Sequence, residues 1–249
     1  MKQAFRWSCM SATRKRYFLR LGGRILVLIG CVLLLILRPE TFGVLNDGGF
    51  FGGLTVLHAL WVIWMIDMAL QLLPIHKRLP LGSAKVFRQN FRPLREGIQP
   101  ESLKRYIRTV SRSALYVMLL WAALIAVLGV LHGSQILRDE HLFLISVLFY
   151  VCDLICVLIW CPFRLMMRNR CCTTCRIFNW DHLMMFSPLI FVRGFYTWSL
   201  VIVAVLVVMC WEGCVILFPE RFWEHTNGSL QCSQCTDKLC TQYCQKLRG

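Results

Sequence analysis

Residues 195–218 read FYTWSLVIVAVLVVMCWEGCVILF, a long apolar run in which the only charged residue is Glu212. A helix needs about 20 apolar residues to cross the ~30 Å hydrocarbon core of a bilayer. Tyr196, Trp198 and Trp211 lie toward the two ends of the run, where aromatic side chains anchor membrane helices at the interfaces. The run therefore predicts a transmembrane helix, and Pro219 closes it.

The composition of the whole chain agrees with a membrane protein. Of its 249 residues, 57% are hydrophobic and 16% are charged, and the mean hydropathy is +0.57. Soluble domains are about 45–50% apolar and about 25% charged. Together with 195–218, four further apolar runs predict an all-α polytopic bundle of about five transmembrane helices, with the others at 21–37, 54–73, 113–132 and 142–163.

One more apolar segment, Leu183–Val192, is only ten residues long before Arg193-Gly194. This length is too short for a continuous membrane helix. The segment is therefore expected to be interfacial or re-entrant.

The basic residues lie in blocks between the apolar runs. Residues 1–24 and the loops 74–112 and 164–182 hold 21 Lys and Arg, whereas the loops 38–53 and 133–141 hold two. Cytoplasmic loops of membrane proteins carry such an excess of Lys and Arg. This predicts a multi-pass protein of the cell (plasma) membrane with a cytoplasmic N-terminus, and five spans would put the tail, 219–249, outside.

The N-terminal region also resembles a signal peptide, because both have a basic start and a short apolar core. Arg38-Pro39-Glu40 follows the first apolar run, in place of a small-residue cleavage site. An uncleaved first span, with Arg20 and Arg24 reaching the interface, is therefore the preferred interpretation.

The net charge of +15 suggests an anionic partner. Nucleic acid is not expected, because no segment outside the apolar runs is long enough for a folded basic domain. The basic loops either serve as topology signals or contact anionic lipid headgroups. The lipid contact would be made mainly by a helix expected from about Ser102 onward. The lipid bilayer is the expected partner, and the oligomeric state is left open.

Several of the 14 cysteines have metal-ligand spacing. Cys172-x-x-Cys175 can bind one tetrahedral metal or form a redox pair, and Cys171 or His182 is a candidate for further ligation. Four more thiols lie close together in the polar tail and can form a four-thiolate zinc site or disulfides: Cys232, Cys235, Cys240 and Cys244. Their spacing differs from that of bacterial ferredoxins, so an iron–sulfur cluster is less favoured than zinc.

Two other cysteine arrangements are open. In the first, Cys172 and Cys175 join Cys232 and Cys235 in one shared four-thiolate site, which requires Leu183–Val192 to cross the membrane. In the second, the pairs Cys152/Cys156 and Cys210/Cys214 face each other at similar depth and bind a soft ion such as Cu(I). Simple helix packing is the preferred account of the second arrangement.

Three ionisable residues lie well inside the predicted spans: His58, Asp67 and Asp153. Burying such groups in hydrocarbon costs a few kcal/mol, so each is expected to face the bundle interior and to have a partner. Asp153 is the deepest, and it is either functional or a hydrogen-bonded structural acid.

The chain contains no G-x-S-x-G, H-E-x-x-H or Gly-rich phosphate-loop motif. We therefore expect a non-enzymatic multispanning membrane protein with zinc-type thiolate sites in the loop 171–182 and in the tail, linked to soft-metal transport or sensing. The alternative is a membrane thiol–disulfide oxidoreductase that relays electrons between Cys172/Cys175 and the tail cysteines.

Overall fold

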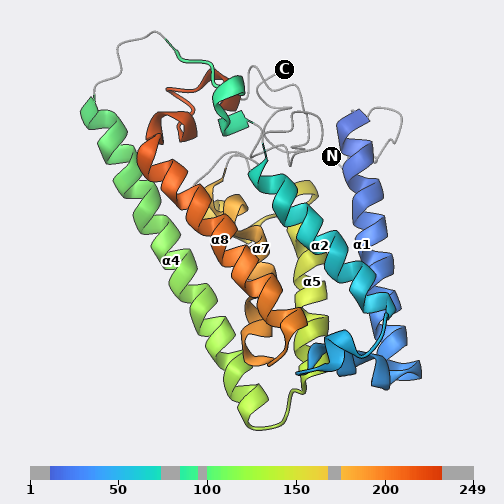
Figure 1. The fold of residues 1–249 in the computed structure, drawn as a ribbon. Coiled ribbons are helices and arrows are strands. Elements are labelled where there is room, and N and C mark those ends of the chain that lie inside the picture. Colours follow the sequence, from blue (N-terminus) through green and yellow to red (C-terminus); the bar gives the residue numbers. More distant parts are fainter. Residues whose placement is uncertain (1–11, 74–84, 95–99, 168–174, 232–249) are drawn as a thin grey trace, which may run out of the picture.

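The computed structural model describes residues 12–73, 85–94, 100–167 and 175–231 (Figure 1). Within these ranges the chain is helical and contains no β-strand. Four helices are long and apolar enough to span a membrane: α1 (Ala12–Leu37), α4 (Pro100–Gly133), α5 (Asp139–Leu158) and α8 (Phe195–Leu217). The 17-residue helix α2 (Val56–Leu72) is also apolar. The prediction of an all-helical chain with membrane-length apolar helices is thus confirmed for the described residues, with four such helices where about five were expected. The cysteine-rich tail from Cys232 lies outside the described residues.

Short helical elements make the connections between these helices. The described ones are η2 (Pro39–Leu45), η3 (Gly49–Phe51), η4 (Arg88–Asn90), α6 (Pro162–Met166), η6 (Arg176–Trp180), α7 (Asp181–Phe186), η7 (Ser187–Phe191), η8 (Pro219–Phe222) and η9 (Gly228–Leu230).

Besides the earlier start of α1 at Ala12, two helix boundaries differ from those expected. α4 begins at Pro100 and continues without a break through the third apolar run, so its 34 residues measure about 50 Å and its basic first turns extend beyond the ~30 Å of a hydrocarbon core. α5 ends at Leu158 rather than near Phe163. Pro162 explains this second difference, because proline disfavours helical backbone at the residue before it and cannot donate a backbone hydrogen bond.

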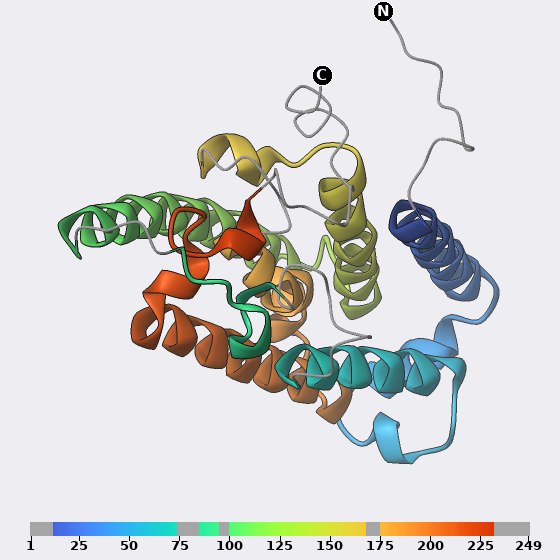
Figure 2. The ribbon, with the colours of Figure 1, turned by 90° about the horizontal axis from the view of Figure 1, so that it is seen from above.

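The core lies where α2, α5, α7 and α8 meet. Trp64 of α2 is completely buried, and its indole packs against the rings of Phe143, Tyr150 and Phe186 with centroids 5.1–5.8 Å apart. Seen from above, α7 lies in the middle, between the long helices (Figure 2). α7, whose sequence resembles that of a loop between helices, is therefore part of the interior of the bundle.

The segment from Arg176 to Phe191 runs from one end of the bundle to the other. At its far end, Phe191 stacks on His132, close to the last turn of α4, with centroids 6.5 Å apart. Phe195 then packs against Phe50 of η3, 4.8 Å between centroids. The end of the bundle that carries η2 and η3 is called the η2 end below.

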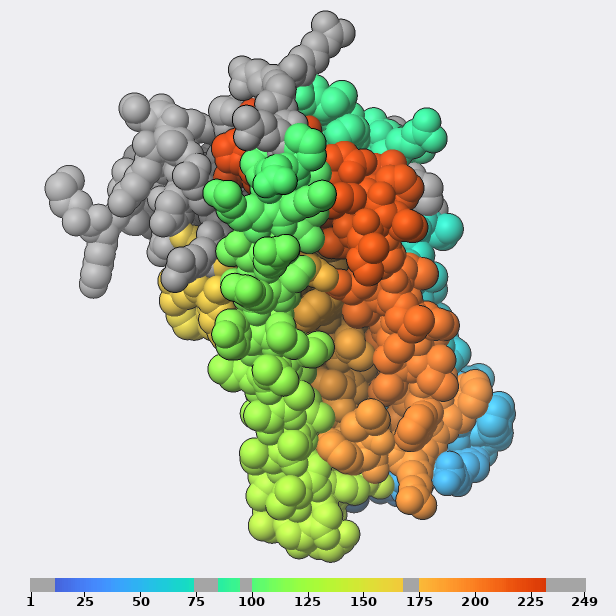
Figure 3. Space-filling model, turned by 90° about the vertical axis from the view of Figure 1, so that its left-hand side faces the viewer, coloured from blue at the N-terminus to red at the C-terminus, as the bar shows by residue number. Residues whose placement is uncertain are grey.

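This finding corrects the expected direction of the last helix. α8 starts at the η2 end and returns to the end of the bundle that holds residues 85–94 and the first turns of α4 (Figures 1 and 3). Residues 219–231 pack on those segments: the amide of Leu94 donates to the carbonyl of Thr226 at 3.2 Å, and the Tyr106 hydroxyl donates to the carbonyl of Phe222 at 3.4 Å. The expectation that the tail leaves the bundle at the end opposite to the basic loop is therefore wrong for residues 219–231. We call the end that holds these segments the basic end.

The physical reason is that the crossing segment is longer than its apolar part. η6, α7 and η7 together contain 16 residues, which span about 24–32 Å at the rise of α- and 3₁₀-helices. Ten apolar residues alone are too short, but the polar residues that precede them continue the path. Irregular backbone and polar groups are tolerated at such depth where surrounding helices bury and pair them.

Candidate functional site

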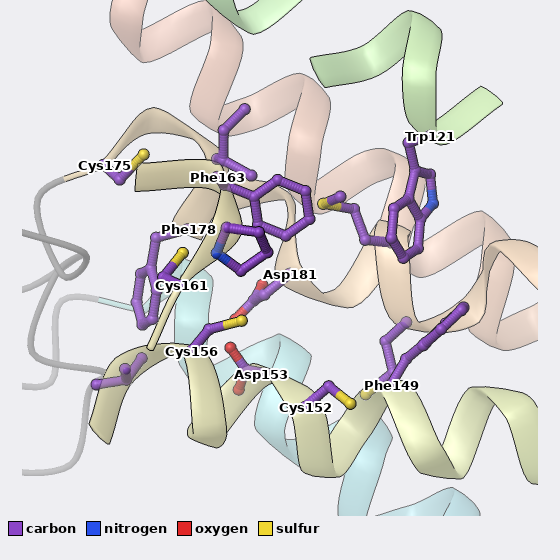
Figure 4. Close-up of a pocket in the computed structure, with 15 residues that line it drawn as sticks. Trp121, Phe149, Cys152, Asp153, Cys156, Cys161, Phe163, Cys175, Phe178 and Asp181 are labelled. Atoms are coloured by element: carbon purple, nitrogen blue, oxygen red, sulfur yellow. The ribbon is translucent and has the colours of Figure 1, made fainter. Parts of the chain in front are cut away.

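A cavity of about 230 Å³ lies between α4, α5, α6 and the η6–α7 segment (Figure 4). Four aromatic side chains form much of its wall: Trp121, Phe149, Phe163 and Phe178. The remaining side chains that bear heteroatoms are four cysteines, two methionines and two acids: Cys152, Cys156, Cys161, Cys175, Met184, Met185, Asp153 and Asp181. Six sulfur-bearing side chains therefore line one cavity.

The local sequence explains how the thiols converge. Cys152 and Cys156 are four residues apart, so they share one face of α5. The break before Pro162 turns the chain back, and the Cys161 side chain comes to line the same cavity as that of Cys156. In Figure 4 the four sulfur atoms follow the cavity in the order Cys175, Cys161, Cys156, Cys152.

The carboxylate of Asp153 is paired with Arg24 of α1. The Arg24 Nη1 lies 2.7 Å from the Asp153 Oδ2, and the same nitrogen donates to the carbonyl of Tyr150 at 2.6 Å. The guanidinium also lies over the Tyr150 ring, 3.8 Å from its centroid. Asp153 thus faces another helix, as expected, whereas Arg24 points into the bundle instead of reaching the membrane interface.

A second polar group surrounds His182. Its Nδ1 lies 2.9 Å from the Asp181 Oδ1 and its Nε2 lies 3.4 Å from the Asp67 Oδ2. The Gln71 side-chain amide of α2 donates to the same Asp181 oxygen at 3.3 Å. Both ring nitrogens of His182 therefore face carboxylates. His182 could bind a metal only if one of these two carboxylate contacts were broken.

A third polar contact holds η6 against α8. The Arg176 guanidinium contacts both carboxylate oxygens of Glu212, with 3.0 Å from Nε to Oε1, and it donates to the Ser111 hydroxyl of α4 at 2.8 Å. The Trp180 indole donates to the Glu212 Oε1 at 2.7 Å. Glu212 therefore lies toward the basic end, because α8 runs opposite to the expected direction, and it fixes the position of Cys175 next to Arg176.

The other predicted site residues are dispersed. His58 accepts from the backbone amide of Thr55 at 3.0 Å and lies 2.9 Å from the carbonyl of Phe50, so it belongs to the η2 end and is separate from Asp67. Cys210 is exposed and Cys214 is half-buried on α8, and neither lines the cavity that Cys152 and Cys156 line. The alternative in which these two cysteine pairs face each other is therefore not observed. Five predicted ligands lie outside the described residues: Cys172, Cys232, Cys235, Cys240 and Cys244.

Among the residues that the structure describes, no three His, Cys, Asp or Glu side chains are grouped so as to hold a metal ion. Cys175 and His182, both predicted as ligands, have separate surroundings: the first lies in the cavity wall and the second between Asp67 and Asp181.

Sequence patterns missed several residues of this region. Arg24 lies at the start of a long apolar run, which makes it a candidate partner for the buried acid Asp153. Cys161 directly precedes Pro162, where the helix is expected to break and the chain to turn. Nothing in the local sequence of Gln71 or Asp181 indicates that they meet. Searches for a matching family model, curated protein or solved structure found none for this chain.

Proposed function

We propose that this chain is a multispanning membrane protein that holds a zinc-type metal ion at a thiolate site shared between the loop 171–182 and the C-terminal tail. The ligands are Cys172 and Cys175 from the loop with Cys232 and Cys235 from the tail. The observation that carries this proposal is the direction of α8, which returns the chain to the basic end before Cys232.

A chain of contacts supports the closeness of the two cysteine segments. The ring of Tyr106 stacks on that of Trp223 with centroids 5.1 Å apart. The ionisable groups of Cys175 and Glu224 both interact electrostatically with the Tyr106 hydroxyl. Gln231, the residue before Cys232, donates from its side chain to the carbonyl of Glu224 at 3.4 Å. Because one residue of extended chain spans at most about 3.6 Å, the tail starts within a few ångströms of Gln231, close to these segments.

Two Cys-x-x-Cys units brought together from separate segments supply four thiolates, the ligand set of tetrahedral structural zinc sites. Such a site would tie the tail to the bundle and would stabilise the fold, since binding free energy of a structural metal is also folding free energy. Cys171, Cys240 and Cys244 are additional candidates, and they allow a tail site with Cys232 and Cys235. Zinc is favoured over an iron–sulfur cluster because the tail spacing differs from that of ferredoxins.

The direction of α8 also supports a particular membrane topology. α1, α2, α4, α5 and α8 cross the bilayer as helices, and η6–α7–η7 crosses as a broken segment within the protein. The described Lys and Arg residues at the η2 end are Arg38, Arg138 and Arg193, while the other described ones lie within the bundle or toward the basic end. The positive-inside rule then makes the basic end cytoplasmic in the plasma membrane, with the N-terminus and the tail both inside and the basic loops near anionic lipid headgroups.

The test is the metal content of the purified full-length protein, measured by mass spectrometry of the elements together with a count of free thiols. We expect one zinc per chain in the wild type and loss of zinc in Cys172→Ser and in Cys235→Ser. Each single change should remove about as much metal as the double change, because a four-thiolate site needs all its ligands. Cys210→Ser, at an exposed position on α8, is the matched control and should keep full occupancy.

A different result would favour the second function, a thiol–disulfide relay. The presence of the Cys156, Cys161 and Cys175 thiols in the wall of one cavity is the observation that favours it. Protein without metal, with disulfides between the loop and the tail, would overturn the metal site and support the relay. Zinc lost in Cys235→Ser but kept in Cys172→Ser would overturn the shared site and support one within the tail.

A further inference from the structure

We propose a second metal site inside the bundle, in which the Cys156 and Cys161 thiolates bind one soft monovalent ion of the Cu(I) class through two sulfur ligands. This site does not rest on the proposed function, because its two ligands are not part of the loop or the tail.

The geometry of the pair supports two-sulfur coordination. The two thiols follow one another along the cavity wall, across the break between α5 and α6 (Figure 4), so an ion that enters the cavity can reach both sulfur atoms. Monovalent d¹⁰ ions accept two sulfur ligands in a near-linear arrangement, whereas zinc requires about four ligands. Since no three potential ligands of the usual kinds are grouped in the described part of the chain, a two-coordinate ion fits this place better than zinc.

The rest of the cavity also favours a soft ion. Its two carboxylates are engaged, Asp153 with Arg24 and Asp181 with His182 and Gln71. Hard ions such as Mg²⁺ need free oxygen ligands and keep water, which an aromatic wall does not replace. Thiolate and thioether sulfur select Cu(I), and Met184 and Met185 line the same cavity.

Binding is balanced in protons and charge. Each thiol gives up its proton and the ion takes their place, so two protons are released for each ion bound and the site gains one negative charge. Arg24 reaches α5 at Asp153, between Cys152 and Cys156, and its positive charge offsets part of that gain. No electron is transferred, so no oxidant or reductant takes part.

The test isolates the cavity from the loop and tail thiols. In a full-length background, Ser replaces the six cysteines outside the described residues that follow α6: Cys171, Cys172, Cys232, Cys235, Cys240 and Cys244. The purified protein is titrated anaerobically with Cu(I) against a chromogenic chelator, and with Ag(I) as an air-stable probe. We expect one ion per chain, a sulfur-only X-ray absorption spectrum with two scatterers, and at least a hundredfold weaker binding after Cys156→Ser or Cys161→Ser. Cys210→Ser in the same background should bind as the background does.

A second measurement requires no variant. In the wild-type protein, Cu(I) or Ag(I) should protect Cys156 and Cys161 from a membrane-permeable maleimide, as read residue by residue by mass spectrometry, while exposed Cys210 stays reactive. Equal labelling of the pair with and without the ion would overturn the site, as would a spectrum with three or four sulfur scatterers. Because the zinc experiment uses other residues, either site can fail while the other stands.

Discussion

At the scale of single residues, the buried charges are arranged in pairs. Asp153 and Arg24 are only 20% and 15% exposed, and each supplies the counter-charge of the other within otherwise apolar helices. Removing one partner of a buried pair leaves an uncompensated charge, whereas removing both leaves none. The pair therefore specifies how α1 packs on α5 more than it stabilises the fold.

Arg24→Gln should destabilise the protein by about 3–5 kcal/mol, because it leaves the Asp153 carboxylate unpaired. Arg24→Gln combined with Asp153→Asn should recover most of that loss. Unfolding monitored in detergent, as a double-mutant cycle, measures the coupling. Arg38→Gln is the control, since Arg38 is exposed at the η2 end, and it should be close to neutral. Additive losses would show that the two residues do not interact.

At the scale of elements, the broken segment η6–α7–η7 depends on close backbone contacts at the η2 end. Gly194 follows it, and a Cβ built there would lie 1.9 Å from the carbonyl oxygen of Leu45 in η2. The backbone of Gly194 is extended, with φ of 173°, so proximity rather than backbone strain requires glycine. This contact joins the start of α8 to η2.

Gly194→Ala should therefore destabilise the protein by about 1–3 kcal/mol, the cost of overpacking. Gly213→Ala, within α8, is the control, because nothing lies within 4 Å of its Cβ position. It should stabilise by up to about 1 kcal/mol, since alanine is the better helix former. Thermal unfolding of the two variants in the same detergent compares them. A neutral Gly194→Ala would contradict the contact between α8 and η2.

At the scale of the whole molecule, the course of η6–α7–η7 along the bundle brings both ends of the described chain to one end of it. Helix α1 begins there, and residues 219–231 end there on the segment 85–94 (Figure 1). This arrangement makes a site shared by loop and tail cysteines possible without any thiol crossing the bilayer.

Reporter fusions test this topology. Green fluorescent protein fused after Gly249 should fluoresce, and alkaline phosphatase fused there should be inactive, because the proposed topology places the tail in the cytoplasm. Alkaline phosphatase fused after Gly194, at the η2 end, should be active, and a fusion after Leu73 serves as the cytoplasmic control. Active phosphatase after Gly249 would contradict both the topology and the shared thiolate site.

The local sequence was sufficient for the class of the protein and the approximate positions of its long helices. Hydropathy is a property of consecutive residues, so runs such as 195–218 predict helices whatever surrounds them. The spacing of Cys152 and Cys156 likewise predicted that they share a helix face. The interior position of Asp153 followed from the cost of exposing an acid to lipid.

Only the tertiary structure decided the direction of α8, the partners of the buried charges and the grouping of the four cavity thiols. The sequence counts only the ten apolar residues of Leu183–Val192, which are too few for a span. Arg176, Asp181 and His182 continue the path through the bundle because Glu212, Gln71 and Asp67 on other helices pair with them. Those partners are 36–115 residues away along the chain, so no local pattern contains them. A polar group is tolerated in a membrane protein only when its partner is present, and that partner is supplied by packing.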